Sequence, residues 1–148
     1  MKNIFAYILL IGITFLNGQN RLNERYHTYD EIRDSLFSWD EQFGQDTEPN
    51  PSFYPNSGII YHLEQLGTST NEEIPFWGVR LSFNANEKED EPRTLILGQC
   101  HAEEILGVEI SMKLISMFLH PEDNQEWAYN LAGLLYFSEI WIVPTHNP

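Results

Sequence analysis

The residues best suited to metal chemistry are a histidine and two glutamates that follow an apolar segment. Residues 94–97 are followed by Gly98-Gln99-Cys100 and then by His101, with Glu103 and Glu104 close behind. An imidazole nitrogen and a carboxylate oxygen both bind zinc, at about 2.0–2.2 Å from the metal. His101 and Glu104 have a His-x-x-Glu spacing, which brings two such ligands within reach of one divalent ion. The glycine before them lets another segment of backbone approach closely.

The same residues also have a purely structural interpretation. Acidic side chains are favoured in the first turn of a helix because of the helix dipole, and Glu103 and Glu104 satisfy that preference if a helix begins there. A single His-x-x-Glu pair often occurs by chance, and a catalytic zinc takes three protein ligands plus water. Four other histidines offer partners, namely His27, His62, His120 and His146. Spacing alone leaves both interpretations open.

The sequence contains one cysteine, Cys100, so an intramolecular disulfide is excluded. A lone cysteine at the end of a strand is typically a small buried apolar residue. A nucleophilic role is the weaker hypothesis, because the neighbouring carboxylates disfavour a thiolate. Stability is therefore expected from the core or from a metal.

The first half of the chain is predicted to form a helix and a β-hairpin. Residues 30–43 have apolar side chains near helical spacing, with Asp30 as the N-cap and Gly44 after the last turn. Residues 58–66 and 75–83 alternate in polarity, as half-buried strands do. The turn-like segment between them indicates an antiparallel hairpin. His62 is expected on the more polar face of its strand.

The histidine and the glutamates lie between the next two predicted elements. Residues 94–100 are apolar without alternation, which predicts a strand covered on both faces. Residues 103–120 predict a helix with only a narrow polar stripe, on which Glu109 and Lys113 form a favourable i,i+4 pair. Pro121 is expected to end this helix.

A weaker helix is predicted over residues 126–137 and a last strand over 138–143. Strands joined through a helix are typically parallel, whereas hairpin strands are antiparallel. The predicted fold class is therefore α/β, with a mixed and mostly parallel sheet sandwiched by helices. Ligands of such sheets bind beyond the carboxyl ends of the strands. Both His101 and His146-Asn147 are expected at that edge.

Charge and hydropathy limit the partners and the location of the protein. The chain has 148 residues, enough for one domain, with a formal net charge of −14 and eight lysines and arginines. Nucleic acid and anionic membrane surfaces are excluded as partners, because both require clustered cations. Lys2 precedes an uncharged run over residues 4–16, which predicts a signal peptide at residues 1–18. We expect export, extracellular or periplasmic, without stable membrane association; a retained anchor is the alternative.

Five segments, in order along the chain, resemble the zinc carboxypeptidases of the carboxypeptidase A type, metallopeptidase family fourteen. They are YHTYDEI, LGTST, PFWGVRLS, LGQCHAEE and EIWIVPTHNP, at residues 26–32, 66–70, 75–82, 97–104 and 139–148. The fourth is similar to the family's Gly-x-His-x-x-Glu segment, and the fifth leads into its Asn-Pro-Asp-Gly loop. The resemblance covers residues 22–148 and implies a zinc-peptidase-like fold.

The resemblance also implies a reaction, the zinc-dependent hydrolysis of C-terminal residues from peptides or proteins. Under it His101 and Glu104 are two of three zinc ligands, Glu103 occupies a variable position, and His146 is a loop residue. In such a site zinc polarises the scissile carbonyl and lowers the pKa of a bound water, whose proton a glutamate accepts.

The chain departs from the family pattern at Asn147-Pro148, where it ends inside the Asn-Pro-Asp-Gly motif. The third ligand (a histidine), the general-base glutamate and the arginines that bind the substrate carboxylate belong to later positions of the family, so no catalytic residue is assigned within this chain. We expect residues 19–148 to be the N-terminal part of a catalytic domain, truncated at its C-terminal end and inactive alone. The alternatives are a non-catalytic peptide-binding module of the same fold and a related zinc amidohydrolase.

Overall fold

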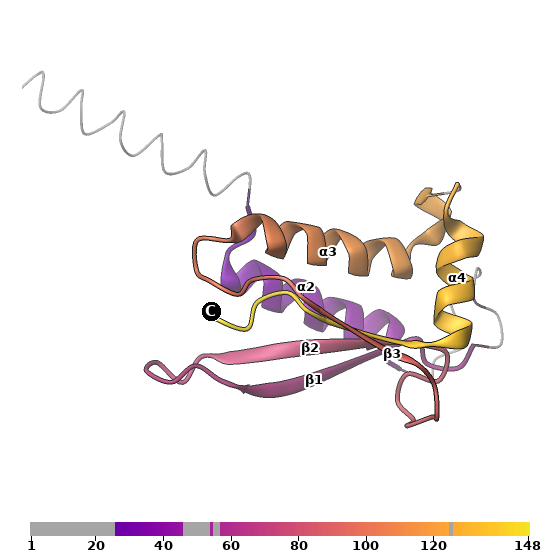
Figure 1. The fold of residues 1–148 in the computed structure, drawn as a ribbon, viewed down its shortest axis with the longest axis horizontal. Coiled ribbons are helices and arrows are strands. Elements are labelled where there is room, and N and C mark those ends of the chain that lie inside the picture. The colour runs from indigo at the N-terminus through magenta and orange to yellow at the C-terminus, as the bar shows by residue number, and fades with distance from the viewer. Residues whose placement is uncertain (1–25, 46–53, 55–56, 125) are drawn as a thin grey trace, which may run out of the picture.

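The computed structural model describes residues 26–45, 54, 57–124 and 126–148 (Figure 1). The predicted signal peptide at residues 1–18 lies outside the described residues. The elements, in chain order, are α2 (Tyr29–Phe43), β1 (Tyr61–Thr68), β2 (Pro75–Leu81), β3 (Arg93–Leu97), α3 (Ile105–Leu119), a short 3-10 helix η1 (Pro121–Asn124), α4 (Ala128–Phe137) and β4 (Glu139–Val143). In this part of the chain no helix combines the length and the apolarity needed to cross a membrane.

The strands form one mixed sheet in the order β1-β2-β4-β3. β1 and β2 make the predicted antiparallel hairpin, with Tyr61 opposite Leu81, and β2 also pairs antiparallel with β4. β3 and β4 pair in parallel, which confirms the predicted crossover through α3. The mixed sheet with packed helices is the predicted fold class, and among the described strands its parallel part is the β3–β4 pair.

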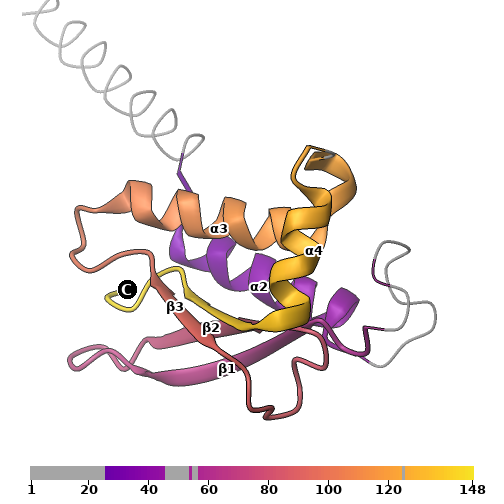
Figure 2. The same cartoon turned by 45° about the vertical axis from the view of Figure 1, so that its right-hand side comes forward.

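The helices α2, α3 and α4 lie on one side of the sheet, where they cover the core (Figures 1 and 2). Leu36 of α2 and Ile115 of α3 are almost fully buried there, as are Val79, Leu81 and Ile142 of the sheet. No helix from the described residues covers the opposite face. The sheet is therefore flanked by helices on one face within the described residues, not on both as the sequence predicted.

The helix α2 begins two residues earlier than predicted. Its N-cap is Thr28, not Asp30, and Thr28 and Glu31 form a capping box in which each side chain bonds the other's backbone N–H. The hydrogen bond from the Thr28 backbone also lowers the pKa of the Glu31 carboxyl. The predicted end is confirmed, because Gly44 is the C-cap and its N–H donates to the carbonyl of Asp40 at 2.9 Å.

The apolar segments around the histidine are more exposed than their sequences predict. On β3 the side chain of Leu95 is 63% exposed and that of Leu97 47% exposed. The prediction of a strand covered on both faces is wrong for the described residues, because β3 is an edge strand whose outer face no described helix covers. On α3, Leu106 and Ile110 are likewise exposed, so that helix is buried along one side only.

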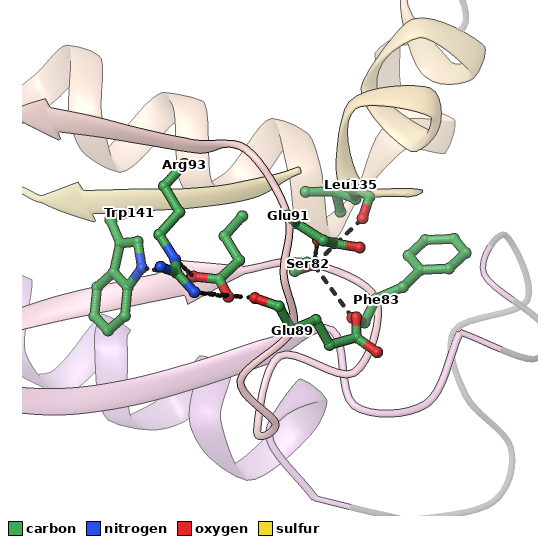
Figure 3. A network of polar contacts seen from close by, with 8 residues as sticks. Ser82, Phe83, Glu89, Glu91, Arg93, Leu135 and Trp141 are labelled. Carbon is green, nitrogen blue, oxygen red and sulfur yellow. Dashed lines mark hydrogen bonds and ion pairs between the residues drawn. The ribbon is translucent and has the colours of Figure 1, made fainter. Parts of the chain in front are cut away.

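A network of polar contacts fastens the loop before β3 to the sheet (Figure 3). Arg93 donates from Nε to the Glu139 carboxylate at 2.8 Å and from an NH2 group to the carbonyl of Glu89 at 3.0 Å. The Glu139 side chain is only 3% exposed, and the bond from Arg93 lowers the pKa of its carboxyl. Ser82 donates to Glu91 at 3.1 Å on the same loop. These contacts hold the start of β3 in register with β4.

Candidate metal centre

Two glycines in direct contact lie at the two ends of the connection from β3 to α3. The N–H of Gly98 donates to the carbonyl of Val143 at 2.8 Å, which extends the parallel pairing one residue past the end of β3. Gly107, in the first turn of α3, lies against Gly98 so closely that a Cβ on Gly107 would come within 1.5 Å of the Gly98 carbonyl oxygen. The close backbone approach predicted for Gly98 is therefore present, and it fixes where α3 starts.

A tight turn between these glycines carries the candidate ligands. The N–H of Glu104 donates to the carbonyl of His101 at 3.0 Å, and that of Gly107 donates to the carbonyl of Glu104 at 3.1 Å. Gln99, which is buried, donates from Nε2 to the carbonyl of Ala102 at 3.0 Å. The turn is thus held both by its own backbone and by a side chain from its first residues.

His101 and Glu104 are in direct contact. The Nδ1 atom of His101 lies 3.0 Å from Oε1 of Glu104, and the His101 backbone N–H donates to Oε2 at 3.2 Å. The bond with the imidazole is the main cause that lowers the pKa of the Glu104 carboxyl. Both side chains face solvent, with exposed fractions of 70% and 49%.

This donor pair fits a divalent metal. A histidine nitrogen and a carboxylate oxygen on a tetrahedral zinc are about 3.3 Å apart, given ligand distances of about 2.0–2.1 Å. The 3.0 Å separation of the two donor atoms therefore differs little from the separation that zinc requires. Within the described residues no group of three or more histidine, cysteine or acidic side chains is placed to hold a metal ion. That His101 and Glu104 are two ligands of a zinc ion stays a prediction.

The two glutamates stand before the helix, not in its first turn. α3 begins at Ile105, and Glu104 is its N-cap residue. The Glu104 side chain makes no capping bond, because its carboxylate binds His101 instead. Glu103 is exposed. The helix-start preference thus does not explain the carboxylate that contacts the histidine.

The remaining histidines lie elsewhere, with one at the same sheet edge. His27 binds Glu109 of α3 through its backbone N–H at 2.7 Å and its Nδ1 at 2.8 Å, so Glu109 pairs with His27 and not with Lys113 as predicted. His62 is opposite Arg80 in the hairpin, and His120 stacks edge-on against Phe43. His146 follows β4 at the edge where His101 lies, and its Nδ1 is buried without a hydrogen-bond partner.

Two features of the site depart from the sequence interpretation. Cys100 is exposed, so the expectation of a buried cysteine at a strand end is wrong. The inward position belongs to its neighbour Gln99, whose Oε1 accepts a 2.6 Å bond from the hydroxyl of Thr145. Sequence reasoning missed both residues of this bond. The one available signal was a polar residue, Gln99, directly after an apolar strand.

A cavity of about 240 Å³ adjoins the turn. Its lining includes Tyr29 and Ile32 of α2, Ala102 and Ile105 at the start of α3, and Thr145 and Asn147 after β4. Residues of the segment after β4 and residues of the turn thus line one cavity, and Figure 1 shows the C end near the connection from β3 to α3.

Known proteins resemble this chain in sequence and in fold. A curated "Zinc carboxypeptidase" from Saccharothrix mutabilis subsp. capreolus is 33% identical over 102 residues, which is 69% of this chain and 22% of that protein. The crystal structure of thrombin activatable fibrinolysis inhibitor superimposes with a TM-score of 0.61 at 18% identity, and that of carboxypeptidase A from Helicoverpa armigera with 0.61 at 16%. They cover 82% and 83% of this chain, and in each case 25% of the solved chain.

These similarities differ in what they show. At such low identity the two crystal structures show the fold, and the chain spans about a quarter or less of each relative's length. The model of the family described as "Zinc carboxypeptidase" matches residues 21–148, nearly the whole chain. This chain therefore belongs to the zinc carboxypeptidase family.

Proposed function

We propose that this chain is part of a zinc metallocarboxypeptidase that hydrolyses C-terminal residues from peptides or proteins, with His101 and Glu104 as two of its three zinc ligands. The observation that carries the proposal is the contact of a histidine nitrogen with a glutamate oxygen at 3.0 Å. It lies at the carboxyl ends of parallel strands in a member of the zinc carboxypeptidase family. The third ligand, the general base and the groups that bind the substrate carboxylate are assigned to positions outside this chain.

The residues of the turn have separate tasks in this proposal. Zinc in such a site polarises a carbonyl oxygen and lowers the pKa of a coordinated water. Glu104 offers an ionised carboxylate, since its pKa is held below the usual range by His101. His101 offers an imidazole nitrogen, a usual zinc donor. The Gly98–Gly107 contact sets the position of both relative to the sheet.

The test is a pair of matched substitutions in the protein made from its complete coding sequence. Zinc stoichiometry is measured by metal analysis, and activity by release of the last residue from blocked peptides. We expect His101→Ala and Glu104→Gln to lose zinc and activity. Glu103→Gln removes the adjacent carboxylate and should retain both. Wild-type protein without stoichiometric zinc, or a fully active His101→Ala variant, contradicts the proposal.

A non-catalytic peptide-binding module is the second candidate. This candidate predicts binding of peptide C-termini with no turnover and no zinc in the complete protein. Release of acyl or cell-wall amide groups instead of C-terminal residues would indicate a related zinc amidohydrolase.

We also propose that the protein is exported, and N-terminal sequencing of the mature protein tests this.

A further inference from the structure

Gln99 is a buried polar residue with a bond at each end of its amide. Its exposed fraction is 8%, and that of Thr145 is 5%. The Thr145 hydroxyl donates to Oε1 of Gln99 at 2.6 Å, and Nε2 of Gln99 donates to the carbonyl of Ala102 at 3.0 Å. Burying an amide is unfavourable unless it is hydrogen-bonded. Both partners are therefore needed for the residue to occupy this position.

The two partners come from different segments of the chain. Ala102 stands inside the His-x-x-Glu turn, between His101 and Glu104. Thr145 is in the segment after β4, 46 residues away from Gln99 in sequence. The Gln99 amide thus joins the turn that carries both candidate ligands to the neighbouring loop.

The other contacts of the turn do not replace this bond. The two candidate ligands are largely exposed, so little packing restrains their side chains. The backbone bond between Glu104 and His101 closes the turn but does not attach it to the sheet. The Gly98–Val143 bond attaches only the first residue of the connection. The Gly98–Gly107 contact fixes the two ends of the connection, and the Glu104 carboxylate bonds His101 within the turn. The Gln99 amide instead joins the Ala102 carbonyl, in the middle of the turn, to Thr145 in the segment after β4.

We propose that Gln99 is a positioning residue of the metal centre. By binding the Ala102 carbonyl while it is held by Thr145, it fixes the turn so that His101 and Glu104 converge on one ion. The inference rests on the proposed function, since it concerns the same metal. Partners that orient metal ligands from behind typically change metal affinity by about 10–100-fold when they are removed.

The experiment compares variants of the protein made from the complete coding sequence. Gln99→Met keeps a similar volume and removes both bonds, and Thr145→Val removes the hydroxyl without changing the shape. Thr145→Ser keeps the hydroxyl. Ser138→Ala is the control, because Ser138 makes a similar bond to a backbone carbonyl, that of Leu134, away from the site. Zinc affinity is measured by competition with a chromophoric chelator, and the stability of the metal-free protein by thermal unfolding.

We expect Gln99→Met to weaken zinc binding by about 10-fold or more, and Thr145→Val by less. Thr145→Ser and Ser138→Ala should stay near wild type. The loss in Gln99→Met combined with Thr145→Val should be smaller than the product of the two single losses, because both act through one bond. If Gln99→Met fails to fold, the difference between Thr145→Val and Thr145→Ser still decides the question.

The outcomes separate this inference from the proposed function. Wild-type protein that binds no zinc overturns both. Wild-type protein that binds zinc while Gln99→Met, or Thr145→Val, binds it equally well overturns only the role of Gln99. Gln99→Met and Thr145→Val could lose thermal stability in the metal-free form and keep the zinc affinity of the wild type. That result would assign Gln99 a structural role alone, and would overturn the proposal as well.

Discussion

At the scale of single residues, the contact of His101 with Glu104 has a consequence for titration. The hydrogen bond with the imidazole lowers the pKa of the Glu104 carboxyl. A group whose pKa is lower in the folded state adds stability above its unfolded pKa, and that stability is lost as the pH falls through the folded pKa. Because both side chains are largely exposed, the quantity to measure is the titration midpoint of Glu104 and not the free energy of unfolding.

We predict that Glu104 in the metal-free protein titrates below the usual glutamate pKa of about 4.3. NMR of the side-chain carboxyl carbons, followed through an acid titration, measures this midpoint. In His101→Ala the midpoint should return upward, because the bond that favours the ionised form is gone. Glu122→Gln, which changes a carboxylate near His120 instead, should leave the midpoint in place. A Glu104 midpoint that is identical in wild type and His101→Ala would contradict the prediction.

The sequence was sufficient for one part of this site and not for another. The His-x-x-Glu spacing is local, since both residues lie within one turn, and the structure places them in contact. The bond between Gln99 and Thr145 joins residues 46 positions apart, and no local pattern encodes such a distance. Apolarity predicts Cys100 inside and gives no reason to expect Gln99 there. However, apolarity decides burial only where a polar side chain has no hydrogen-bond partner in the interior.

At the scale of elements, the contact between Gly98 and Gly107 ties the position of α3 to the end of β3. A side chain on Gly107 has no room, since its Cβ would lie 1.5 Å from the carbonyl oxygen of Gly98. α3 would have to move away from the strand. Because the turn from residue 98 to residue 104 lies between them, such a movement would also displace the candidate ligands.

We therefore predict that Gly107→Ala destabilises the protein by about 3 kcal/mol, the upper end of the usual range for overpacking. Gly133→Ala is the matched control. Gly133 is inside α4, and a Cβ there would meet nothing within 4 Å. Alanine at that position should stabilise the protein by about 0.5–1 kcal/mol through helix propensity. Urea unfolding measures both, and a Gly107→Ala variant as stable as Gly133→Ala would show that the two backbones are not in contact.

The elements themselves were largely predictable, and the errors concern their ends and their burial. The hairpin, the parallel crossover and the helix that ends at Pro121 follow from periodicity and from glycine and proline. The N-cap of α2 was assigned to Asp30, although Thr28 and Glu31 have the spacing of a capping box. Both Thr28 and Asp30 are good cap residues. The box pattern, which only Thr28 completes, was the better guide.

At the scale of the whole molecule, exposed apolar surface is the main departure from the sequence prediction. Periodicity indicates how apolar an element is on each side, and it does not say which segment covers that side. The chain spans 25% of the solved chains that share its fold. We propose that further parts of the protein cover the outer side of β3.

This proposal predicts that residues 19–148 self-associate when they are expressed alone. An edge strand offers unpaired N–H and C=O groups to any second strand, and apolar side chains favour the contact. β3 is such an edge, since β4 is the neighbour it has in the sheet. Sedimentation velocity at increasing concentration measures the association. A monomer at all concentrations would contradict the prediction.

Two lysine substitutions separate pairing of the edge strand from general apolar contact. Leu95 on β3 and Leu106 on α3 are almost equally exposed, at 63% and 64%, so a lysine removes a similar apolar surface at either position. A lysine on an edge strand also opposes pairing with a second strand. We expect Leu95→Lys to reduce association more than Leu106→Lys does. Equal effects would mean that the exposed side of α3 contributes as much to self-association as β3 does. The β3 edge would then not be the surface that further parts of the protein chiefly cover.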